Sequence, residues 1–388
     1  MFKILMVFLM VFSMTSNSQS IRVATFNVSM DGTNYVEQGQ VPIGNELSKN
    51  LLSGEHKQIK NIAEIIQRVR PDIILLNEFD YSNNAMSDVE HFLNLYLKMP
   101  QNHKDPIDYP YFYSAAVNTG VNSGMDLDKD SIASGTQGDA FGFGFYPGQY
   151  GMLVLSKYPI EQHKIRTFQH FLWKDMPNSL LPTIEETNGE PYYSHAAQQI
   201  LRLSSKSHWD IPIKFGEDII HLLASHPTPP VFDGPENRNG KRNHDEIRFW
   251  NDYLSGNQRS AYIYDDQGNS GGFQGEHFII AGDLNASPDE GDGLKDGIRG
   301  LLTHPLVNNA VVPTSEAASM HSPNNEFAAQ HTAEWAMRAD YVLPSTSLET
   351  NGRGVFWPKK DDPLYRLIKG RESSSDHRLV WVDIVAKD

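Results

Sequence analysis

Short apolar segments that end abruptly in polar side chains recur along this chain, and they constrain its fold most strongly. The clearest is HFIIAGDLN over residues 277–285, where the apolar run stops at Gly282 and is followed by Asp283 and Asn285. A short apolar run bounded by turn residues predicts a buried strand. Because rigid strand ends in α/β proteins hold side chains in fixed positions, we expect such polar ends to form one site.

The same pattern predicts six further strands, together with two helices and long loops. The predicted strands cover residues 21–28, 72–76, 151–155, 219–224, 338–343 and 379–385. Residues 55–69 carry apolar side chains at helical spacing and Pro71 ends that helix, whereas residues 245–254 predict a shorter one. We expect a long loop over residues 118–151 and an insertion over residues 160–218. No internal repeat or linker divides the chain, so we predict one α/β domain with two sheets packed face to face and helices outside.

The first residues, MFKILMVFLMVFSMTSNSQS, resemble a secretory signal peptide. Lys3 supplies positive charge, residues 4–12 form an apolar run, and SNS at residues 16–18 offers a cleavage site between small residues. The alternative is a membrane anchor, but the run is too short to span a bilayer comfortably. We expect residues 1–18 to be a signal peptide cleaved near Ser18. Residues 19–388 would then be a single secreted or periplasmic domain without stable membrane insertion.

Composition narrows the classes of site that the chain can build. It contains no cysteine, which excludes disulfides, thiolate zinc sites, cysteine nucleophiles and lipoprotein attachment. Its net charge of −15 argues against a protein whose main function is to bind duplex DNA. Such a protein needs a basic surface, because neutralising the DNA phosphates supplies most of the affinity. The charge favours a small or weakly held substrate and carboxylates gathered around a cation.

Polar residues with complementary chemistry are expected at the carboxyl ends of the predicted strands. They are Asn27, Glu78, His226, Asp283, Asn285, Asp340, Asp376 and His377. Each alone is typical of a turn or a surface position, but together they make a chemical set. Carboxylate and carboxamide oxygens suit Mg²⁺, Ca²⁺ or Mn²⁺. Histidines beside such a cation can exchange protons near neutral pH, and a carboxylate behind a histidine fixes its tautomer.

Seven motifs in order make the chain resemble the endonuclease/exonuclease/phosphatase superfamily, which includes deoxyribonuclease I, the apurinic endonucleases, bacterial sphingomyelinases and inositol polyphosphate phosphatases. The motifs are TFNVSM (25–30), DIILLNEFD (72–80), GMLVLSKYPI (151–160), ASHPTPP (224–230), AGDLN (281–285), RADYVL (338–343) and SSDH (374–377). They span nearly the whole mature chain. The resemblance implies a deoxyribonuclease I-like four-layer sandwich of two mainly antiparallel sheets between outer helices.

The resemblance also implies a metal site. Glu78 would be the principal metal carboxylate, with Asn27 and Asp376 as further members of the metal shell. The cofactor would be one or two divalent cations, with Mg²⁺ favoured and Ca²⁺ or Mn²⁺ as alternatives.

Catalytic roles follow from the same resemblance. Asp283 would orient the attacking water or hold a second cation, and Asn285 would donate to the scissile phosphate. His377 would be the catalytic histidine, oriented by Asp340. His226 would be a second histidine close to the phosphate, which the apurinic endonucleases usually lack.

Two loops are candidates for contacts with substrate. Residues 233–246 read DGPENRNGKRNHDE, and their cations Arg238, Lys241 and Arg242 are interpreted either as a phosphate clamp or as a solvated loop. The glycine- and aromatic-rich residues 138–152 are interpreted either as a wall of the pocket or as an ordinary packed loop.

The sequence therefore favours a secreted, divalent-metal-dependent phosphoesterase, expected to be a monomer, that hydrolyses small organic phosphate mono- or diesters by in-line attack of an activated water. A secreted deoxyribonuclease I-like endonuclease would use the same residues, with nucleic acid as partner. A lipid head-group phosphodiesterase would need an exposed apolar hairpin, which the sequence does not show. A non-catalytic binding module on the same fold is the lowest-ranked alternative, because the complete set of polar residues argues against a drifted site.

Overall fold

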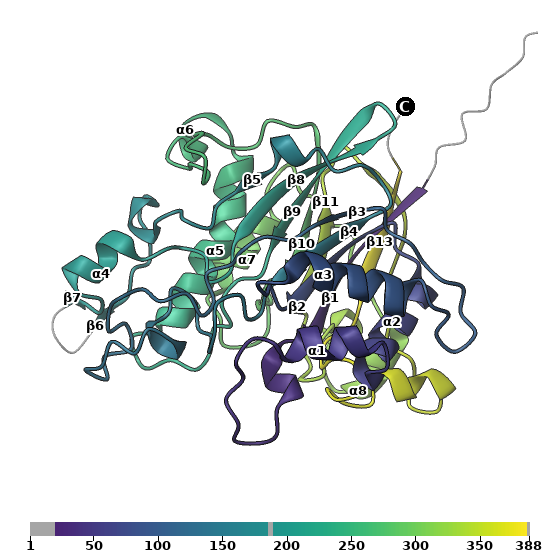
Figure 1. The fold of residues 1–388 in the computed structure, drawn as a ribbon. Helices are drawn as coiled ribbons and strands as arrows, with labels where there is room; N and C mark the ends of the chain where they lie inside the picture. Colours follow the sequence, from purple (N-terminus) through teal and green to yellow (C-terminus); the bar gives the residue numbers. More distant parts are fainter. Residues whose placement is uncertain (1–19, 185–188, 386–388) are drawn as a thin grey trace, which may run out of the picture.

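The computed structural model describes residues 20–184 and 189–385, so the predicted signal peptide over residues 1–18 lies outside the described residues. Two sheets pack face to face in the centre of the molecule (Figure 1). Helices α1, α2 and α3 lie on one side of the pair, and α5 and α7 lie on the other.

The helices have the following bounds. The α-helices are α1 (Glu46–Ser53), α2 (Lys57–Val69), α3 (Ala85–His91), α4 (His195–Ile200), α5 (Arg238–Leu254), α6 (Asn257–Ser260), α7 (Lys295–Leu302) and α8 (Glu316–His321). Short 3₁₀-helices cover Gly32–Tyr35, Gln137–Asp139, Gln162–Lys164, Trp173–Asp175, Ala328–Gln330 and Pro363–Leu367, and a π-helix covers Phe92–Leu97.

The first sheet has the strand order β12-β13-β1-β2-β4-β3. Its strands are β1 (Ser20–Met30), β2 (Ile73–Phe79), β3 (Tyr111–Tyr113), β4 (Met152–Ser156), β12 (Glu349–Val355) and β13 (Val380–Val385). Only the central pair, β1 and β2, runs parallel; the other neighbours are antiparallel.

The second sheet has the order β11-β10-β9-β8-β5 and repeats this arrangement. Its strands are β5 (Arg166–Thr167), β8 (His208–Phe215), β9 (Asp218–Ser225), β10 (His277–Asp283) and β11 (Asp340–Pro344). Here β9 and β10 form the parallel pair among antiparallel neighbours. A small ribbon of β6 (Thr183–Ile184) and β7 (Glu190–Pro191) lies apart from both sheets.

Alternation along the strands sorts apolar side chains into three buried layers. Val23 and Ile73 face Ile211 and Ile279 between the two sheets. On the outer face of the first sheet, Phe26 packs with α2 and its neighbours. On the outer face of the second sheet, the strands pack against α5 and α7. The predicted four-layer sandwich with two mainly antiparallel sheets is confirmed.

A buried amide joins the two sheets at the edge where the parallel strands end. The Oδ1 atom of Asn77, on β2, accepts from the backbone N–H of Asp283 at 3.1 Å and from the hydroxyl of Thr25 at 3.3 Å. Its Nδ2 donates to the carbonyl of Ser225 at 3.5 Å. Because Asn77 is fully buried, these bonds fix the ends of β2, β9 and β10 against one another.

Two sequence-based expectations differ from the structure. Helix α5 begins at Arg238 and not at residue 245, so the predicted basic loop is largely helical. Tertiary contacts override the Gly- and Asn-rich composition, because Asn243 Nδ2 donates to the carbonyls of Thr228 and Leu284 at 2.8 and 3.0 Å. The predicted insertion over residues 160–218 contributes β5 and β8 to the second sheet, and the alternation of Trp209, Ile211 and Ile213 marks β8.

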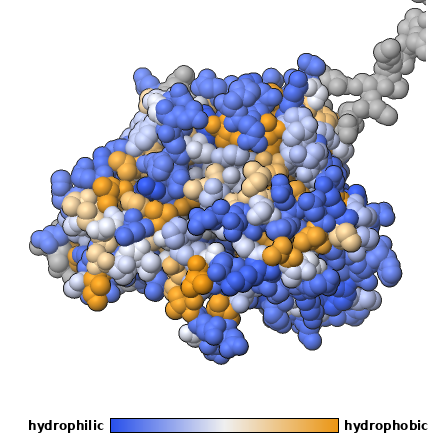
Figure 2. All heavy atoms as spheres, viewed as in Figure 1, coloured by the Kyte–Doolittle hydropathy of each residue, from blue (hydrophilic) through white to orange (hydrophobic). Residues whose placement is uncertain are grey.

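The described helices include none with the length and apolar character needed to cross a membrane. The surface in the same view is mostly hydrophilic, with apolar residues in separate patches (Figure 2).

The buried histidine of β8 generates a prediction about acid stability. His208 is 1% exposed, its Nε2 bonds the carbonyl of Glu246 at 2.8 Å, and its Nδ1 lies 3.2 Å from the hydroxyl of Ser204. Burial lowers the pKa of His208 to about 4. The folded state therefore favours the neutral ring, and this contribution to stability is present above about pH 6.5 and is lost as the pH falls toward 4.

We expect His208→Gln to flatten the pH dependence of the unfolding free energy by up to about 1.4 kcal/mol per pH unit between pH 6.5 and 4. Urea unfolding at several pH values measures this slope. His163→Gln replaces a histidine whose side chain is 76% exposed and should leave the slope unchanged. An unaltered slope in His208→Gln would show that folding does not lower the pKa of His208.

Candidate active site

Asp283, the last residue of β10, is the centre of a buried polar cluster. Its Oδ2 accepts from Asn27 Nδ2 at 3.1 Å, and it lies 3.4 Å from His226 Nε2 and 3.5 Å from His377 Nε2. Its Oδ1 accepts from the backbone N–H of Asn285 at 2.9 Å. One carboxylate thus gathers groups from β1, from the end of β9 and from the segment before β13.

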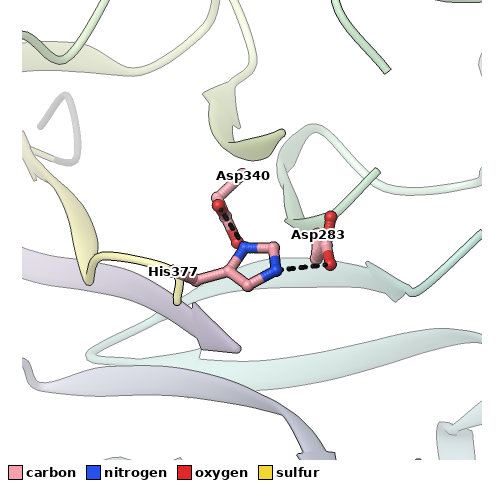
Figure 3. Close-up of side chains that lie close together, drawn as sticks. All are labelled: Asp283, Asp340 and His377. Atoms are coloured by element: carbon pink, nitrogen blue, oxygen red, sulfur yellow. Dashed lines mark hydrogen bonds and ion pairs between the residues drawn. The ribbon is translucent and has the colours of Figure 1, made fainter. Parts of the chain in front are cut away.

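His377 lies between two carboxylates, with one ring nitrogen toward each (Figure 3). Its Nδ1 lies 2.9 Å from Asp340 Oδ2, opposite the contact of Nε2 with Asp283. Asp340 Oδ2 also accepts from the hydroxyl of Thr332 at 2.7 Å, and the rings of Trp335 and His377 lie nearly perpendicular with their centroids 4.7 Å apart. This geometry favours a ring that is protonated on both nitrogens.

The electrostatics of the cluster give the two histidines opposite protonation states. Burial lowers the pKa of His377, but the charges of Asp340 and Asp283 outweigh it and raise that pKa to about 10. Burial and the charge of Lys206 lower the pKa of His226 to about 4. Burial would raise the pKa of Asp283, yet His377 and His226 hold it well below its usual range. At neutral pH the site therefore contains one proton donor and one proton acceptor.

Asp283, Asp340 and His377 lie close enough together to share a metal ion. A metal-bound histidine must have one ring nitrogen deprotonated, whereas both nitrogens of His377 face carboxylates here. These three side chains therefore form a hydrogen-bonded network, and a cation would be held elsewhere in the site.

The predicted metal residues lie beside this network. Glu78 on β2 has a positive φ of 57°, and its Oε2 is buried without a hydrogen bond to any residue that the structure describes. Burial and the charge of Asp31 raise the pKa of Glu78 to about 7. A buried carboxylate oxygen without a donor is stabilised by a cation, so Glu78 fits a divalent ion. Asp376 Oδ1 accepts from the hydroxyl of Ser29 at 3.2 Å, and Asn27 Oδ1 accepts from the backbone N–H of Ser29 at 3.1 Å.

Arg371 is a residue of the site that the sequence analysis missed. Its guanidinium lies 3.6 Å from Glu78 Oε2 and 3.9 Å from Asp376 Oδ2. It therefore joins the two carboxylates that were predicted to hold the metal. The only sequence signal was its position two residues before the SSSD segment over residues 373–376.

Three predicted site residues lie at the amino ends of their strands, not at the carboxyl ends. Asp340 is the first residue of β11, while Asp376 and His377 precede β13. These strands run antiparallel to β10 and β1, so their amino ends meet the carboxyl ends of their partners at the same edge. Asp340, Asp376 and His377 therefore lie at the site as predicted. The prediction that they follow the carboxyl ends of strands was wrong.

Asn285 lies at the cluster with a positive φ of 51°. Its Nδ2 donates to the carbonyl of Pro227 at 3.1 Å, directly after His226. The predicted role as a donor to phosphate remains a prediction, because one N–H of this amide is already engaged with the backbone.

A cavity of about 460 Å³ adjoins the cluster. Glu78, His226 and Arg371 line one part of it, and Leu127, Tyr193 and other apolar side chains line another. Phe143 lines it as well, so the aromatic loop over residues 138–152 does form part of the wall. Lys206 and Thr228 also line the cavity, and the sequence analysis did not identify either as a site residue.

The structure separates the three cations of the predicted phosphate clamp. Arg238 lines the cavity but is paired with Glu236. Arg242 also lines it, while its Nε and Nη2 donate to the carbonyls of Leu203, Phe141 and Arg202 and so tie α5 to two loops. Lys241 is absent from the lining among the described residues.

A family model described as the Endonuclease/Exonuclease/phosphatase family matches residues 24–377. A search of curated proteins gives no match.

The chain is also similar to several solved structures. One is an endonuclease/exonuclease/phosphatase family protein from Leptotrichia buccalis C-1013-b, at 16% identity, covering 94% of this chain and 99% of that one, with a TM-score of 0.47. Another is an endonuclease/exonuclease/phosphatase from Beutenbergia cavernae DSM 12333, at 15% identity, 95% and 72% coverage and a TM-score of 0.45. A third is sphingomyelinase C from Streptomyces griseocarneus, at 15% identity, 95% and 100% coverage and a TM-score of 0.42. Likeness at this level does not bear on the substrate.

The position of His377 between two carboxylates generates a prediction. We expect Asp340→Asn to lower the pKa of His377 from about 10 toward the ordinary value of about 6.5, because one of the two charges that favour the imidazolium is removed. Titration of the His377 ring by NMR measures this value. Glu217→Gln, in the exposed turn between β8 and β9, is the matched control and should not change it. A pKa that stays near 10 in Asp340→Asn would contradict the proposed pairing.

Proposed function

The chain belongs to the Endonuclease/Exonuclease/phosphatase family, and on that basis we propose that it hydrolyses small organic phosphate mono- or diesters with the help of a divalent cation. It is thus a hydrolase acting on phosphate ester bonds. The signal-like sequence of residues 1–18 supports export to the periplasm or the medium, where such an enzyme would release phosphate from external compounds.

The observation that carries this proposal is the cavity that adjoins the Asp283 cluster. Its volume of about 460 Å³ is in the range of pockets that hold small molecules. His226 lies both in its lining and 3.4 Å from Asp283. A compact ester can therefore place its phosphate at the cluster and its alcohol portion in the cavity.

In this proposal Asp283, His226 and His377 have separate roles in hydrolysis of the phosphate ester. Asp283 accepts hydrogen bonds and orients the attacking water toward phosphorus. His226 is neutral at working pH, with Nε2 toward Asp283 and Nδ1 without a hydrogen-bond partner in the described part of the chain, so Nδ1 can accept a proton. His377 carries a proton at working pH and stabilises negative charge on the phosphoryl oxygens or protonates the departing oxygen. Asp340 and Thr332 hold its orientation.

A divalent cation fits beside these groups. Glu78 would hold it, with Asn27 and Asp376 close by, and Mg²⁺ is the favoured ion for oxygen ligands of this kind. When bound, the cation supplies positive charge that polarises a phosphoryl oxygen.

The proposal is tested by an assay of residues 19–388 with and without chelator. One arm contains a chromogenic phosphomonoester and its matching diester, and the other contains plasmid DNA. We expect chelator-sensitive release from a small ester and intact plasmid. Plasmid nicking with little turnover of small esters would overturn the proposed substrate class in favour of a nuclease, and absence of hydrolysis in both arms would overturn catalysis.

Glu78 gives a second prediction with a readout other than turnover. We expect Glu78→Gln to abolish the rise in melting temperature that Mg²⁺ produces in the wild type, because the variant loses the principal ligand and binding stabilises only the folded state. In chelator the variant should melt at or above the wild-type temperature, since it no longer buries a carboxylate oxygen that lacks a hydrogen-bond donor among the described residues. Glu217→Gln should keep the full Mg²⁺ response. A full response in Glu78→Gln would place the cation elsewhere.

A further inference from the structure

Lys206 is a buried cation in the cavity wall that the proposed chemistry has not used. It is 5% exposed, and its ammonium forms no hydrogen bond or ion pair with the residues described by the structure. Its backbone is held in place, because Asn118 donates to the carbonyls of Ser204 and Lys206 at 2.8 and 2.9 Å. Buried lysines are ordinarily paired, so an ammonium kept free at a cavity needs an explanation.

A buried carboxylate balances this charge without binding it. Glu246 on α5 is fully buried, and its two oxygens accept from the backbone N–H groups of Ser205 and Thr228, each at 2.6 Å. Burial holds the pKa of Lys206 below its ordinary value, although the charges of Glu246, Glu78 and Asp283 counteract part of this effect. Glu246 therefore supplies countercharge while the donors of Lys206 remain available for a ligand.

Two hydroxyl groups in the same wall are also without partners. The side-chain oxygens of Ser205 and Thr228 are buried and make no hydrogen bond within residues 20–184 and 189–385, and both residues line the cavity with Lys206. They are 3% and 8% exposed. Because the carboxylate of Glu246 binds the backbones of both residues, it brings the segments before β8 and after β9 together. Unpaired buried donors on two adjoining segments indicate a ligand rich in acceptors.

We propose that Lys206, Ser205 and Thr228 form a binding subsite for phosphoryl oxygens of the substrate. One ammonium and two hydroxyls suit an anionic group with several free oxygens. His226 joins this subsite to the Asp283 cluster, because it follows Ser225 and lines the same cavity. The subsite rests on the proposed phosphoesterase function, but it binds phosphate whether or not an ester is cleaved.

The surroundings of the subsite also indicate how it contributes to the reaction. The charge of Lys206 acts on Glu78, Asp283 and His226, so the ammonium lies within electrostatic reach of the groups that carry the chemistry. Its charge favours the neutral form of His226, which is the form that can accept a proton. Lys206 is thus placed to hold the phosphoryl group and to keep its neighbouring histidine unprotonated.

The test is isothermal titration calorimetry of inorganic phosphate into the mature chain in the presence of Mg²⁺. We expect Lys206→Met to weaken phosphate binding by about 10–100-fold, because charge-assisted hydrogen bonds are lost. Lys206→Arg should retain part of the affinity. Lys214→Met removes an exposed lysine at the far end of β8 and should bind phosphate like the wild type.

Melting temperatures show whether a variant that binds phosphate weakly is still folded. Lys206→Met removes an unpaired buried charge, so its melting temperature should equal or exceed that of the wild type, and its Mg²⁺ response should persist. Ser205→Ala and Thr228→Val each delete one hydroxyl without removing the charge, and each should weaken phosphate binding about 3–10-fold.

The outcomes distinguish this subsite from the proposed function. Phosphate binding by Lys206→Met at wild-type affinity, or no phosphate binding by the wild type, would overturn the subsite even if the wild type hydrolyses esters. Lysine-dependent phosphate binding without hydrolysis of any ester would support the subsite and overturn the catalytic proposal.

Discussion

The carboxylate of Asp283, buried between the two sheets, is the interaction on which the rest of the site depends. Its Oδ2 faces Asn27, His226 and His377, which come from three separate segments. An unpaired charge in this position would be costly, so the contacts specify one arrangement of the sheet edges. The same contacts set the opposite protonation states of the two histidines. Structural order and chemical function therefore arise from a single buried charge.

Topology explains why distant residues meet at this charge. Each sheet has one parallel pair at its centre, and the carboxyl ends of both pairs lie at the same edge. Antiparallel neighbours present their amino ends there, which brings in Asp340 and His377. At Gly282 an added Cβ would lie 2.0 Å from the carbonyl oxygen of Ser225, so only glycine permits the close approach of β9 and β10 just before Asp283.

Backbone conformation at the strand ends is also specialised. Ser29, Glu78 and Asn285 have positive φ angles of 49°, 57° and 51°. Non-glycine residues adopt this region at a cost that the surrounding structure must offset, and such residues concentrate at functional sites. The carboxylate of Glu78, near the end of β2, lies in the cavity wall next to Arg371. Most of the remaining cavity wall comes from residues 119–143, 193–206 and 228–242.

The sequence by itself determined the strand cores, the family resemblance and most of the polar cluster, because short apolar runs and their polar ends are local signals. Asn27, His226, Asp283, Asp340 and His377 were all found in this way. The sequence could not determine which buried side chains lack a hydrogen-bond or ion-pair partner among the described residues. Lys206 and Arg371 carry no local pattern, and Arg242 reads as a surface cation although it binds backbone carbonyls. Tertiary structure decided these roles, because burial, countercharge and free hydrogen-bond donors depend on segments that are distant in the chain.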